Sequence, residues 1–272
     1  MYKAIFIDID GTLRNNKREV TKRTMEAVKK TVESGILVVI CSGRPRKYTE
    51  DVSRKACASN YIISSNGCSI YDYAQKQVLY ENIMDKKACV ELYKISEQSG
   101  IRFIMNVGDG RVVSELHSKD NLEEKLSTDI ETFVNNNNVV QCTLADSDFE
   151  KMKNLRTTIE QVPNVAIKNQ HKSLVNPEAP KEGSIYYDVS NVGINKGTGI
   201  KKFCEILNID LKDVIAIGDD KNDLPMFKMA GLSVAMGNAT GEVKEHADQI
   251  TLSNEEDGVA VFLEKLNDNF NS

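Results

Sequence analysis

Short, almost continuously apolar runs alternate with amphipathic stretches in the first 64 residues and again after residue 191. Apolar runs bounded by polar residues are typical of parallel strands that are covered on both faces. They predict strands, in chain order, at residues 4–8, 36–41, 61–64, 214–217, 232–235 and 249–252. The apolar spacing between them predicts helices at about residues 21–34, 45–57, 196–207, 241–247 and 258–266, with a further helix that ends near Met229. This alternation predicts a Rossmann-like, doubly wound α/β core with a parallel sheet.

The pattern changes in the middle of the chain. Asp85 is a suitable N-cap and Gly100 a suitable terminator for an amphipathic helix, and Gly108-Asp109-Gly110 suits a hairpin turn. Other apolar stretches predict paired strands at residues 101–106, 111–116, 139–145, 165–168 and 185–189. They also predict a weaker helix between residue 116 and the polar loop at 135–138, and a helix at 149–159. Helices combined with paired strands indicate a separate α+β domain inserted into the first. We therefore predict a core domain formed by residues 1–82 and 190–272, and an inserted α+β domain over residues 83–189.

Composition narrows the class of protein. The chain has 272 residues and a formal net charge of −5, with no block of lysine and arginine that would follow a nucleic-acid backbone. It contains no apolar run of the roughly 20 residues that span a bilayer, and no secretion signal at its start. Its six cysteines are scattered without a C-x-x-C pair, which favours isolated thiols over disulfides or a zinc site. We expect a cytoplasmic protein with neither nucleic-acid nor membrane partners; the sequence carries no signal of oligomeric state.

Acidic residues follow two of the predicted strands directly. Asp8 ends the first predicted strand and Asp10 follows it closely, and Asp219 and Asp223 follow the strand at 214–217. The alternation of an extended chain would point Asp8 and Asp10 the same way. Carboxylates that lie close together at the end of a buried strand repel each other and lose solvation unless a cation compensates. Oxygen ligands of this kind suit Mg²⁺. We therefore predict a Mg²⁺ site at the carboxyl edge of the sheet, where open α/β sheets bind ligands.

Two further polar groups fall near strand ends and suit a phosphoryl group. The Ser42 hydroxyl, the backbone N–H groups near Gly43 and the Lys196 ammonium can all donate hydrogen bonds to phosphate oxygens. A carboxylate that attacks a phosphate dianion faces repulsion of about 8 kcal/mol, for charges about 4 Å apart at an effective dielectric near 20. Mg²⁺ and a lysine would offset that repulsion.

This chemistry assigns different tasks to the first two acids. Asp8 could attack phosphorus as the nucleophile and form an aspartyl-phosphate. Asp10 could protonate the leaving alkoxide and later deprotonate water, an effect of about 10²- to 10⁴-fold. The three histidines, His117, His171 and His246, lie in no motif and are interpreted as surface or packing residues.

At these positions the sequence resembles the haloacid dehalogenase (HAD) superfamily, specifically its Cof-type sugar-phosphatase branch (subfamily IIB). The resemblance spans four motifs, namely Asp8-x-Asp10-Gly11-Thr12-Leu13, Ser42-Gly43-Arg44-Pro45, Asn195-Lys196-Gly197 and Gly218-Asp219-x-x-Asn222-Asp223. The family more often has threonine at the position of Ser42, and serine keeps the hydroxyl. The inserted domain has the size and α+β order of the family's larger cap, which would close over the site.

The resemblance also implies roles for individual residues. It implies a Mg²⁺ ion held by the Asp8 carboxylate, the Asp10 carbonyl and the Asp219 carboxylate, with Asp223 as an acid on the metal side. It implies phosphate contacts from the Ile9 backbone, Ser42, Gly43, Lys196 and Asn222. Arg44 and Asn66 are expected to face the leaving group or the cap. The predicted cap contains no motif whose function could be carried over from the family, so the resemblance does not identify the substrate.

The sequence therefore predicts a Mg²⁺-dependent phosphatase that hydrolyses small phosphorylated metabolites, such as sugar phosphates, through an aspartyl-phosphate. Two alternatives stay open. A phosphomutase uses the same intermediate and returns the phosphoryl group to the substrate. A non-catalytic metal- or phosphate-binding protein could keep the fold, although such a switch does not need the acid at Asp10.

Overall fold

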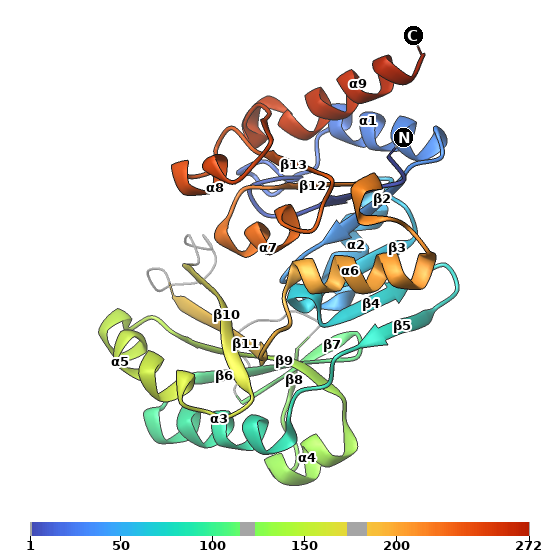
Figure 1. Cartoon of the computed structure of the whole chain (residues 1–272). Helices are drawn as coiled ribbons and strands as arrows, with labels where there is room; N and C mark the ends of the chain where they lie inside the picture. Colours follow the sequence, from blue (N-terminus) through green and yellow to red (C-terminus); the bar gives the residue numbers. More distant parts are fainter. Residues whose placement is uncertain (1, 115–122, 173–183, 272) are drawn as a thin grey trace. The chain divides into compact units, whose positions relative to one another are not determined.

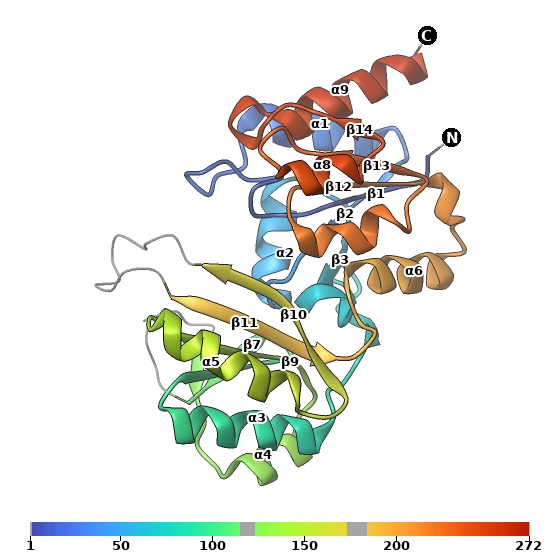
Figure 2. The same cartoon turned by 60° about the vertical axis from the view of Figure 1, so that its left-hand side comes forward.

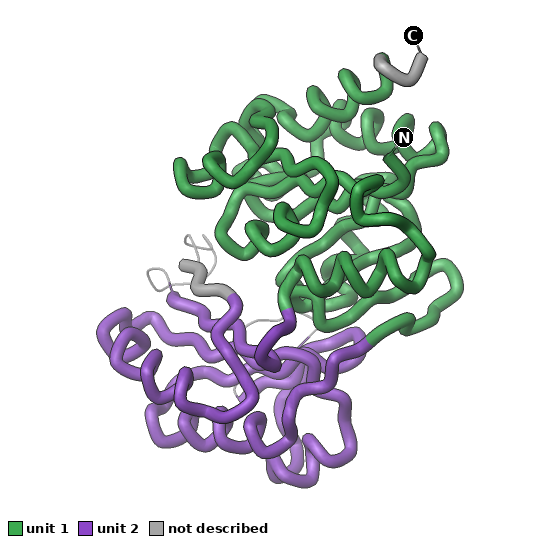
Figure 3. The backbone as a smooth tube through the Cα atoms, in the orientation of Figure 1, with its two compact units in different colours: residues 1–80, 195–272 green, residues 81–194 purple. Residues whose placement is uncertain are grey.

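The computed structural model describes residues 2–114, 123–172 and 184–271. The chain folds into two compact units, which Figure 3 colours separately. The first comprises Met1–Tyr80 and Asn195–Ser272, and the second comprises Glu81–Ile194. The second unit is thus an insertion into the first, and each unit has its own sheet and apolar core.

The first unit is built on an eight-stranded sheet with the order β14-β13-β12-β1-β2-β3-β4-β5. The strands are β1 (Ala4–Ile7), β2 (Leu37–Cys41), β3 (Tyr61–Ser64), β4 (Ser69–Asp72), β5 (Gln77–Glu81), β12 (Val214–Gly218), β13 (Leu232–Ala235) and β14 (Gln249–Ile250). The pairs from β14 to β3 are parallel, and β4 runs antiparallel to β3. In the centre, Ile7 of β1 pairs with both Ile40 of β2 and Ile217 of β12. This register brings the residues that follow the three strands to the same edge.

Helices cover both faces of this sheet (Figures 1 and 2). On one face, α1 (Lys22–Glu33), α2 (Arg46–Lys55) and α9 (Gly258–Asn271) pack against side chains such as Ile5 and Ile7. On the other, α6 (Lys196–Leu207), α7 (Leu224–Phe227) and α8 (Gly241–Glu245) pack against Ala4 and Phe6. Short 3₁₀ helices lie in the connections, namely η1 (Ser65–Gly67), η2 (Leu211–Asp213), η3 (Lys221–Asp223) and η4 (Asn254–Glu256). The predicted doubly wound architecture is confirmed.

The second unit has a six-stranded sheet with the order β10-β11-β9-β6-β7-β8. Its strands are β6 (Arg102–Val107), β7 (Gly110–Val113), β8 (Glu123–Lys125), β9 (Val139–Asp146), β10 (Val165–Lys172) and β11 (Ile185–Asn191). Helices α3 (Lys86–Ser99), α4 (Ile130–Asn136) and α5 (Phe149–Glu160) contribute to one core with Phe103, Leu144 and Tyr187 of the sheet. The side chains of Asp85, Asp129 and Asp148 cap these helices.

Several elements differ from the prediction. Strands β4 and β5 were not predicted, because β4 has only two consecutive apolar residues and no residue of β5 is buried. The strand expected at 111–116 is observed at Gly110–Val113, and the end of the predicted range lies outside the described residues. The helix expected to reach Met229 is a 3₁₀ turn followed by the short α7.

Two further expectations concern membranes and thiols. Among the described residues, none of the helices is long and apolar enough to cross a bilayer. All six cysteines are free thiols, five of them buried, and only Cys57 is exposed.

Candidate active site

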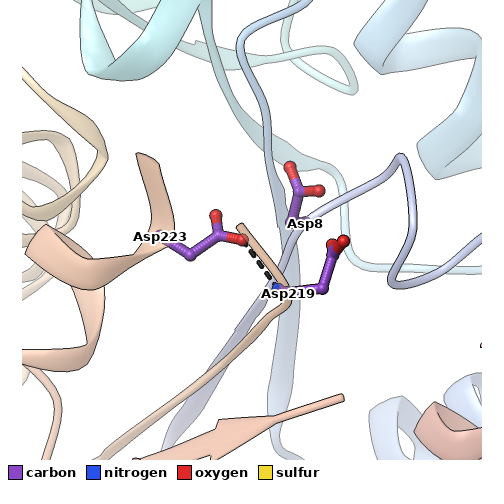
Figure 4. Close-up of side chains that lie close together, drawn as sticks. All are labelled: Asp8, Asp219 and Asp223. Carbon is purple, nitrogen blue, oxygen red and sulfur yellow. Dashed lines mark hydrogen bonds between the residues drawn. The ribbon is translucent and has the colours of Figure 1, made fainter. Parts of the chain in front are cut away.

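Three aspartates meet at the carboxyl edge of the sheet in the first unit. Asp8 follows β1 and Asp219 follows β12, the strand beside it, while Asp223 ends η3. One carboxylate oxygen of each lies within 4.8 Å of the others, as Figure 4 illustrates. Gly218 permits this approach, because a Cβ atom there would lie 2.4 Å from the Asp223 carboxylate. Of the four acids that the sequence predicts to gather here, the fold brings together Asp8, Asp219 and Asp223, and the Asp10 carboxylate is not part of this group.

A buried lysine bridges two of these acids. Lys196 Nζ donates hydrogen bonds to Asp8 Oδ1 at 2.5 Å and to Asp223 Oδ1 at 2.6 Å, and its side chain is only 1% exposed. Its position at the start of α6 is fixed by Asn195, which forms a capping box with Thr198. Burial alone would lower the pKa of Lys196, but the Asp223 and Asp8 carboxylates outweigh burial and raise it. Lys196 is therefore a cation at neutral pH.

Burial and the neighbouring carboxylates disfavour the charged forms of two of these acids. Burial, together with the charges of Asp223 and Asp219, raises the pKa of Asp8 well above its usual value despite the attraction of Lys196. Burial and the charge of Asp223 also raise the pKa of Asp219 to about 7, against the hydrogen bond from Thr12. A divalent cation would relieve this cost, and carboxylate oxygens are the ligands that Mg²⁺ prefers. The donor set therefore fits Mg²⁺.

The three acids are not equivalent as metal ligands. Asp223 accepts the Lys196 ammonium on Oδ1 and the N–H groups of Asp219 and Asp220 on Oδ2, at 2.9 and 3.0 Å. Both Asp223 oxygens are thus occupied by hydrogen bonds, one from Lys196 and the other from the backbone after β12. This suits an acid that lies next to the metal without binding it directly. Asp8 and Asp219 fit direct ligation better.

Thr12 and Gly11 position Asp219. Thr12 Oγ1 donates a hydrogen bond of 2.6 Å to Asp219 Oδ1. Gly11 has a φ of +84°, and a Cβ atom on it would lie 2.2 Å from Asp219 Oδ2. Both residues belong to the first motif, but the sequence assigned them no task; the contact to Asp219, 207 residues away, appears only in the fold.

Asp10 lies in different surroundings from Asp8. Strand β1 ends at Ile7, so strand alternation does not determine how Asp8 and Asp10 are oriented. The Asp10 carboxylate is 41% exposed and accepts a 2.8 Å hydrogen bond from Arg44 Nε. Partial burial acts to raise the pKa of Asp10, but Arg44 and, to a smaller extent, Arg14 lower it below its usual value. Neither Arg14 nor its partner Tyr48 was a candidate from the sequence.

A third group of candidate residues lies at the ends of β2 and β3. Ser42 is buried, and its Oγ accepts the Arg44 N–H at 3.2 Å. A Cβ atom on Gly43 would lie 2.9 Å from Asn66 Oδ1, so the turn packs directly on Asn66. Asn222 Nδ2 donates to the same Asn66 oxygen at 3.3 Å. The fold thus joins Ser42, Gly43, Asn66 and Asn222, although they come from three separate connections.

The last candidate is the Ile9 backbone, and the three histidines were interpreted as surface or packing residues. The Ile9 side chain is fully buried, which leaves only its backbone to act in a site. His246 is exposed, and its ring contacts the Glu242 carbonyl. His117 and the side chain of His171 lie outside what the structure describes.

Comparison with known proteins assigns this chain to a family. It matches the family of haloacid dehalogenase-like hydrolases over residues 5–263. It is 29% identical to the 5-amino-6-(5-phospho-D-ribitylamino)uracil phosphatase YwtE of Bacillus subtilis, with 97% of this chain and 98% of the relative covered. It is 27% identical to the phosphoglycolate phosphatase of Methanobrevibacter smithii, with 97% of each covered.

Solved structures agree with this assignment. A haloacid dehalogenase-like hydrolase from Bacteroides thetaiotaomicron superposes with a TM-score of 0.81 at 28% identity, covering 98% of this chain and all of the other. The HAD subclass IIB sugar phosphatase BT4131 shares the fold, with a TM-score of 0.75 at 24% identity and coverage of 97% and 98%. The chain therefore belongs to the haloacid dehalogenase-like hydrolases, and it is a Cof-type phosphatase that hydrolyses phosphoric monoesters.

Proposed function

We propose that this protein is a Mg²⁺-dependent phosphatase of small phosphorylated metabolites and that it works through an aspartyl-phosphate on Asp8. The observation that carries the proposal is the pair of hydrogen bonds from the buried Lys196 to Asp8 and Asp223, beside Asp219. A buried cation among three acids is costly to maintain and is typical of a functional site.

In the proposed first step, Asp8 attacks phosphorus. A new bond forms between a carboxylate oxygen of Asp8 and phosphorus as the bond between phosphorus and the leaving oxygen breaks. Lys196 orients the Asp8 carboxylate and supplies positive charge where the phosphoryl oxygens would lie. Because its pKa is raised, Lys196 keeps this charge throughout.

Asp10 is proposed as the proton carrier. As an acid it gives a proton to the leaving oxygen, and as a carboxylate it then takes a proton from the water that attacks the aspartyl-phosphate. In that second step the bond from phosphorus to water oxygen forms and the bond to Asp8 breaks, which releases phosphate and restores Asp8. The lowered pKa of Asp10 favours the carboxylate that the second step requires.

The remaining candidates would bind the phosphoryl group and the metal. We assign phosphate contacts to the Ile9 backbone, Ser42, Gly43, Lys196 and Asn222, and contacts on the leaving-group side to Arg44 and Asn66. We assign Mg²⁺ binding to the Asp8 carboxylate, the Asp10 carbonyl and the Asp219 carboxylate, with Asp223 beside them. When bound, the ion would neutralise the carboxylates and the phosphoryl oxygens.

The substrate class rests on relatives. Two similar phosphatases act on a phosphoribityl compound and on phosphoglycolate, and a protein of the same fold is a sugar phosphatase. We therefore propose small phosphorylated metabolites, with sugar phosphates foremost. A panel of phosphorylated metabolites, assayed for free phosphate and for isomerised substrate, would identify the ester and separate phosphatase from phosphomutase.

A direct test compares turnover of p-nitrophenyl phosphate by the wild type and by Asp8→Asn. We expect Mg²⁺-dependent turnover that EDTA abolishes, and no turnover by Asp8→Asn. Asp51→Asn provides the control, because Asp51 is a half-exposed acid on α2 that pairs with Lys47. Absence of turnover by the wild type would favour a non-catalytic protein, and metal-independent turnover by Asp8→Asn would exclude Asp8 as the nucleophile.

A further inference from the structure

Two arginines hold the two oxygens of the Asp10 carboxylate separately. Arg44 Nε lies 2.8 Å from Oδ2, and Arg14 Nη1 lies 3.8 Å from Oδ1. Arg44 belongs to the turn after β2, whereas Arg14 follows β1 and lies four residues after Asp10. One oxygen of Asp10 thus accepts a hydrogen bond from Arg44, and the other forms a longer ion pair with Arg14, so a cation lies beside each oxygen although the side chain is 41% exposed.

Tyr48 of α2 joins the two arginines. The guanidinium carbons of Arg44 and Arg14 lie 5.3 and 5.8 Å from the centre of its ring, within the range of cation–π attraction. Its hydroxyl also accepts a hydrogen bond from Arg14 Nη1. Tyr48 is therefore the common support of both cations that face Asp10.

Arg14 is itself held by further hydrogen bonds to its side chain and to its backbone. Its side chain is only 11% exposed, and its Nε donates a 2.6 Å hydrogen bond to the Arg18 carbonyl. Its backbone carbonyl accepts a hydrogen bond from Asn254 Nδ2 at 2.9 Å. These hydrogen bonds and the low exposure fix the position of Arg14 more firmly than that of an arginine in an exposed surface ion pair.

We infer that Arg14 and Tyr48 are positioning residues that orient the Asp10 carboxylate for proton transfer, an inference that rests on the proposed function. Neither residue needs to touch the substrate. They act through Asp10, which delivers its proton to the leaving oxygen only when a carboxylate oxygen lies within hydrogen-bond reach of it. Their removal should therefore impair proton transfer more than binding or nucleophilic attack.

Leaving groups that differ in their need for a proton provide the test. The nitro group of p-nitrophenyl phosphate stabilises the departing anion, whereas phenyl phosphate has nearly the same shape and a more basic leaving group. The ratio of kcat/KM for p-nitrophenyl phosphate to that for phenyl phosphate therefore reports on proton delivery. A general loss of folded protein lowers both values and leaves the ratio unchanged.

Four variants define the experiment. Arg14→Met and Tyr48→Phe are expected to raise the ratio about tenfold, part of the 10²- to 10⁴-fold effect of a general acid. Asp10→Asn should raise it further. Arg54→Met is the matched control, because Arg54 lies on α2 like Tyr48 and makes the same kinds of contact as Arg14. It stacks on the Tyr73 ring at 4.2 Å and pairs with Glu50 instead of Asp10.

Adding Arg14→Met to Asp10→Asn decides whether Arg14 acts through Asp10. If it does, the double variant has the same ratio as Asp10→Asn alone, since residues that act as a unit are not additive. An unchanged ratio in Arg14→Met and Tyr48→Phe, or a further increase in the double variant, would overturn the inference while leaving the phosphatase assignment intact. Failure of the proposed function itself would instead appear as absence of turnover of either ester by the wild type.

Discussion

The Lys196 ammonium lies 2.5 Å from the Asp8 carboxylate and is almost completely buried beside it. The two residues are 188 positions apart, and the fold joins them because β1 lies next to β12 and α6 begins at the same edge of the sheet. Lys196 also binds Asp223, so one cation balances two buried acids. This arrangement makes Lys196 both a structural and a chemical element of the site.

Replacing Lys196 by methionine should therefore destabilise the first unit as well as abolish turnover. The change leaves Asp8 and Asp223 buried without their cation, and breaking such pairs costs about 3 to 5 kcal/mol. Urea unfolding of the metal-free protein measures the loss of free energy. Added Mg²⁺ should restore part of the stability, because the ion neutralises the same acids. An unchanged free energy of unfolding in the metal-free variant would show that Lys196 does not stabilise the buried Asp8 and Asp223 carboxylates.

Thr12→Val should weaken Mg²⁺ binding about 10- to 100-fold, the usual effect of removing a hydrogen bond that orients a ligand. The change keeps the side chain's shape and removes only the 2.6 Å hydrogen bond to Asp219. Calorimetric titration of the purified protein with Mg²⁺ measures the affinity. Thr143→Val is the matched control, since Thr143 makes an equivalent 2.7 Å bond to Asp188 in the second unit. Equal losses in both variants would exclude a specific role for Thr12.

Asp85→Asn should weaken α3 at neutral pH but not in acid. The hydrogen bond from the Ala88 N–H group holds the pKa of Asp85 below its ordinary value of 3.8. A carboxylate with a lowered pKa contributes stability above pH 3.8, and the contribution is lost as the pH falls through the folded-state pKa. Asparagine caps helices nearly as well as aspartate but lacks the charge.

Amide hydrogen exchange, corrected for the intrinsic rate at each pH, checks this prediction locally. The α3 amides of Asp85→Asn should exchange faster than those of the wild type at pH 7, and the difference should narrow below pH 3.8. The α4 amides provide an internal control, because Asp129 still caps that helix. A difference that persists unchanged in acid would show that the charge of Asp85 is not what stabilises the helix.

The sequence predicted the parts of the fold that depend on local pattern. Strands buried on both faces, such as β1 and β12, leave continuous apolar runs, and the acids that follow them stand out for that reason. Because β1 and β12 are parallel neighbours, the residues that follow them, Asp8 and Asp219, lie close together. By contrast, no residue of β5 is buried, and this strand was missed.

Contacts between distant side chains could not be predicted from pattern. Nothing in the residues around Arg14 indicates that Tyr48 of α2 would bind it, because that pairing depends on how α2 packs beside the first connection. The tasks of Asp223 likewise depend on the 3₁₀ turn that directs its Oδ2 to two backbone N–H groups. These roles depend on how distant segments pack against each other, which cannot be predicted from local patterns in one sequence.

The proposed intermediate carries the phosphoryl group on Asp8, and it can be trapped chemically. The protein would be mixed with p-nitrophenyl phosphate and Mg²⁺, quenched during turnover and reduced with borohydride, which converts an aspartyl-phosphate to homoserine. Asp10→Asn should increase the trapped fraction, because it slows the attack of water. We predict homoserine at position 8, seen by mass spectrometry of the N-terminal peptide. A phosphoryl group trapped on any other residue, or undiminished turnover by Asp8→Asn, would contradict the account.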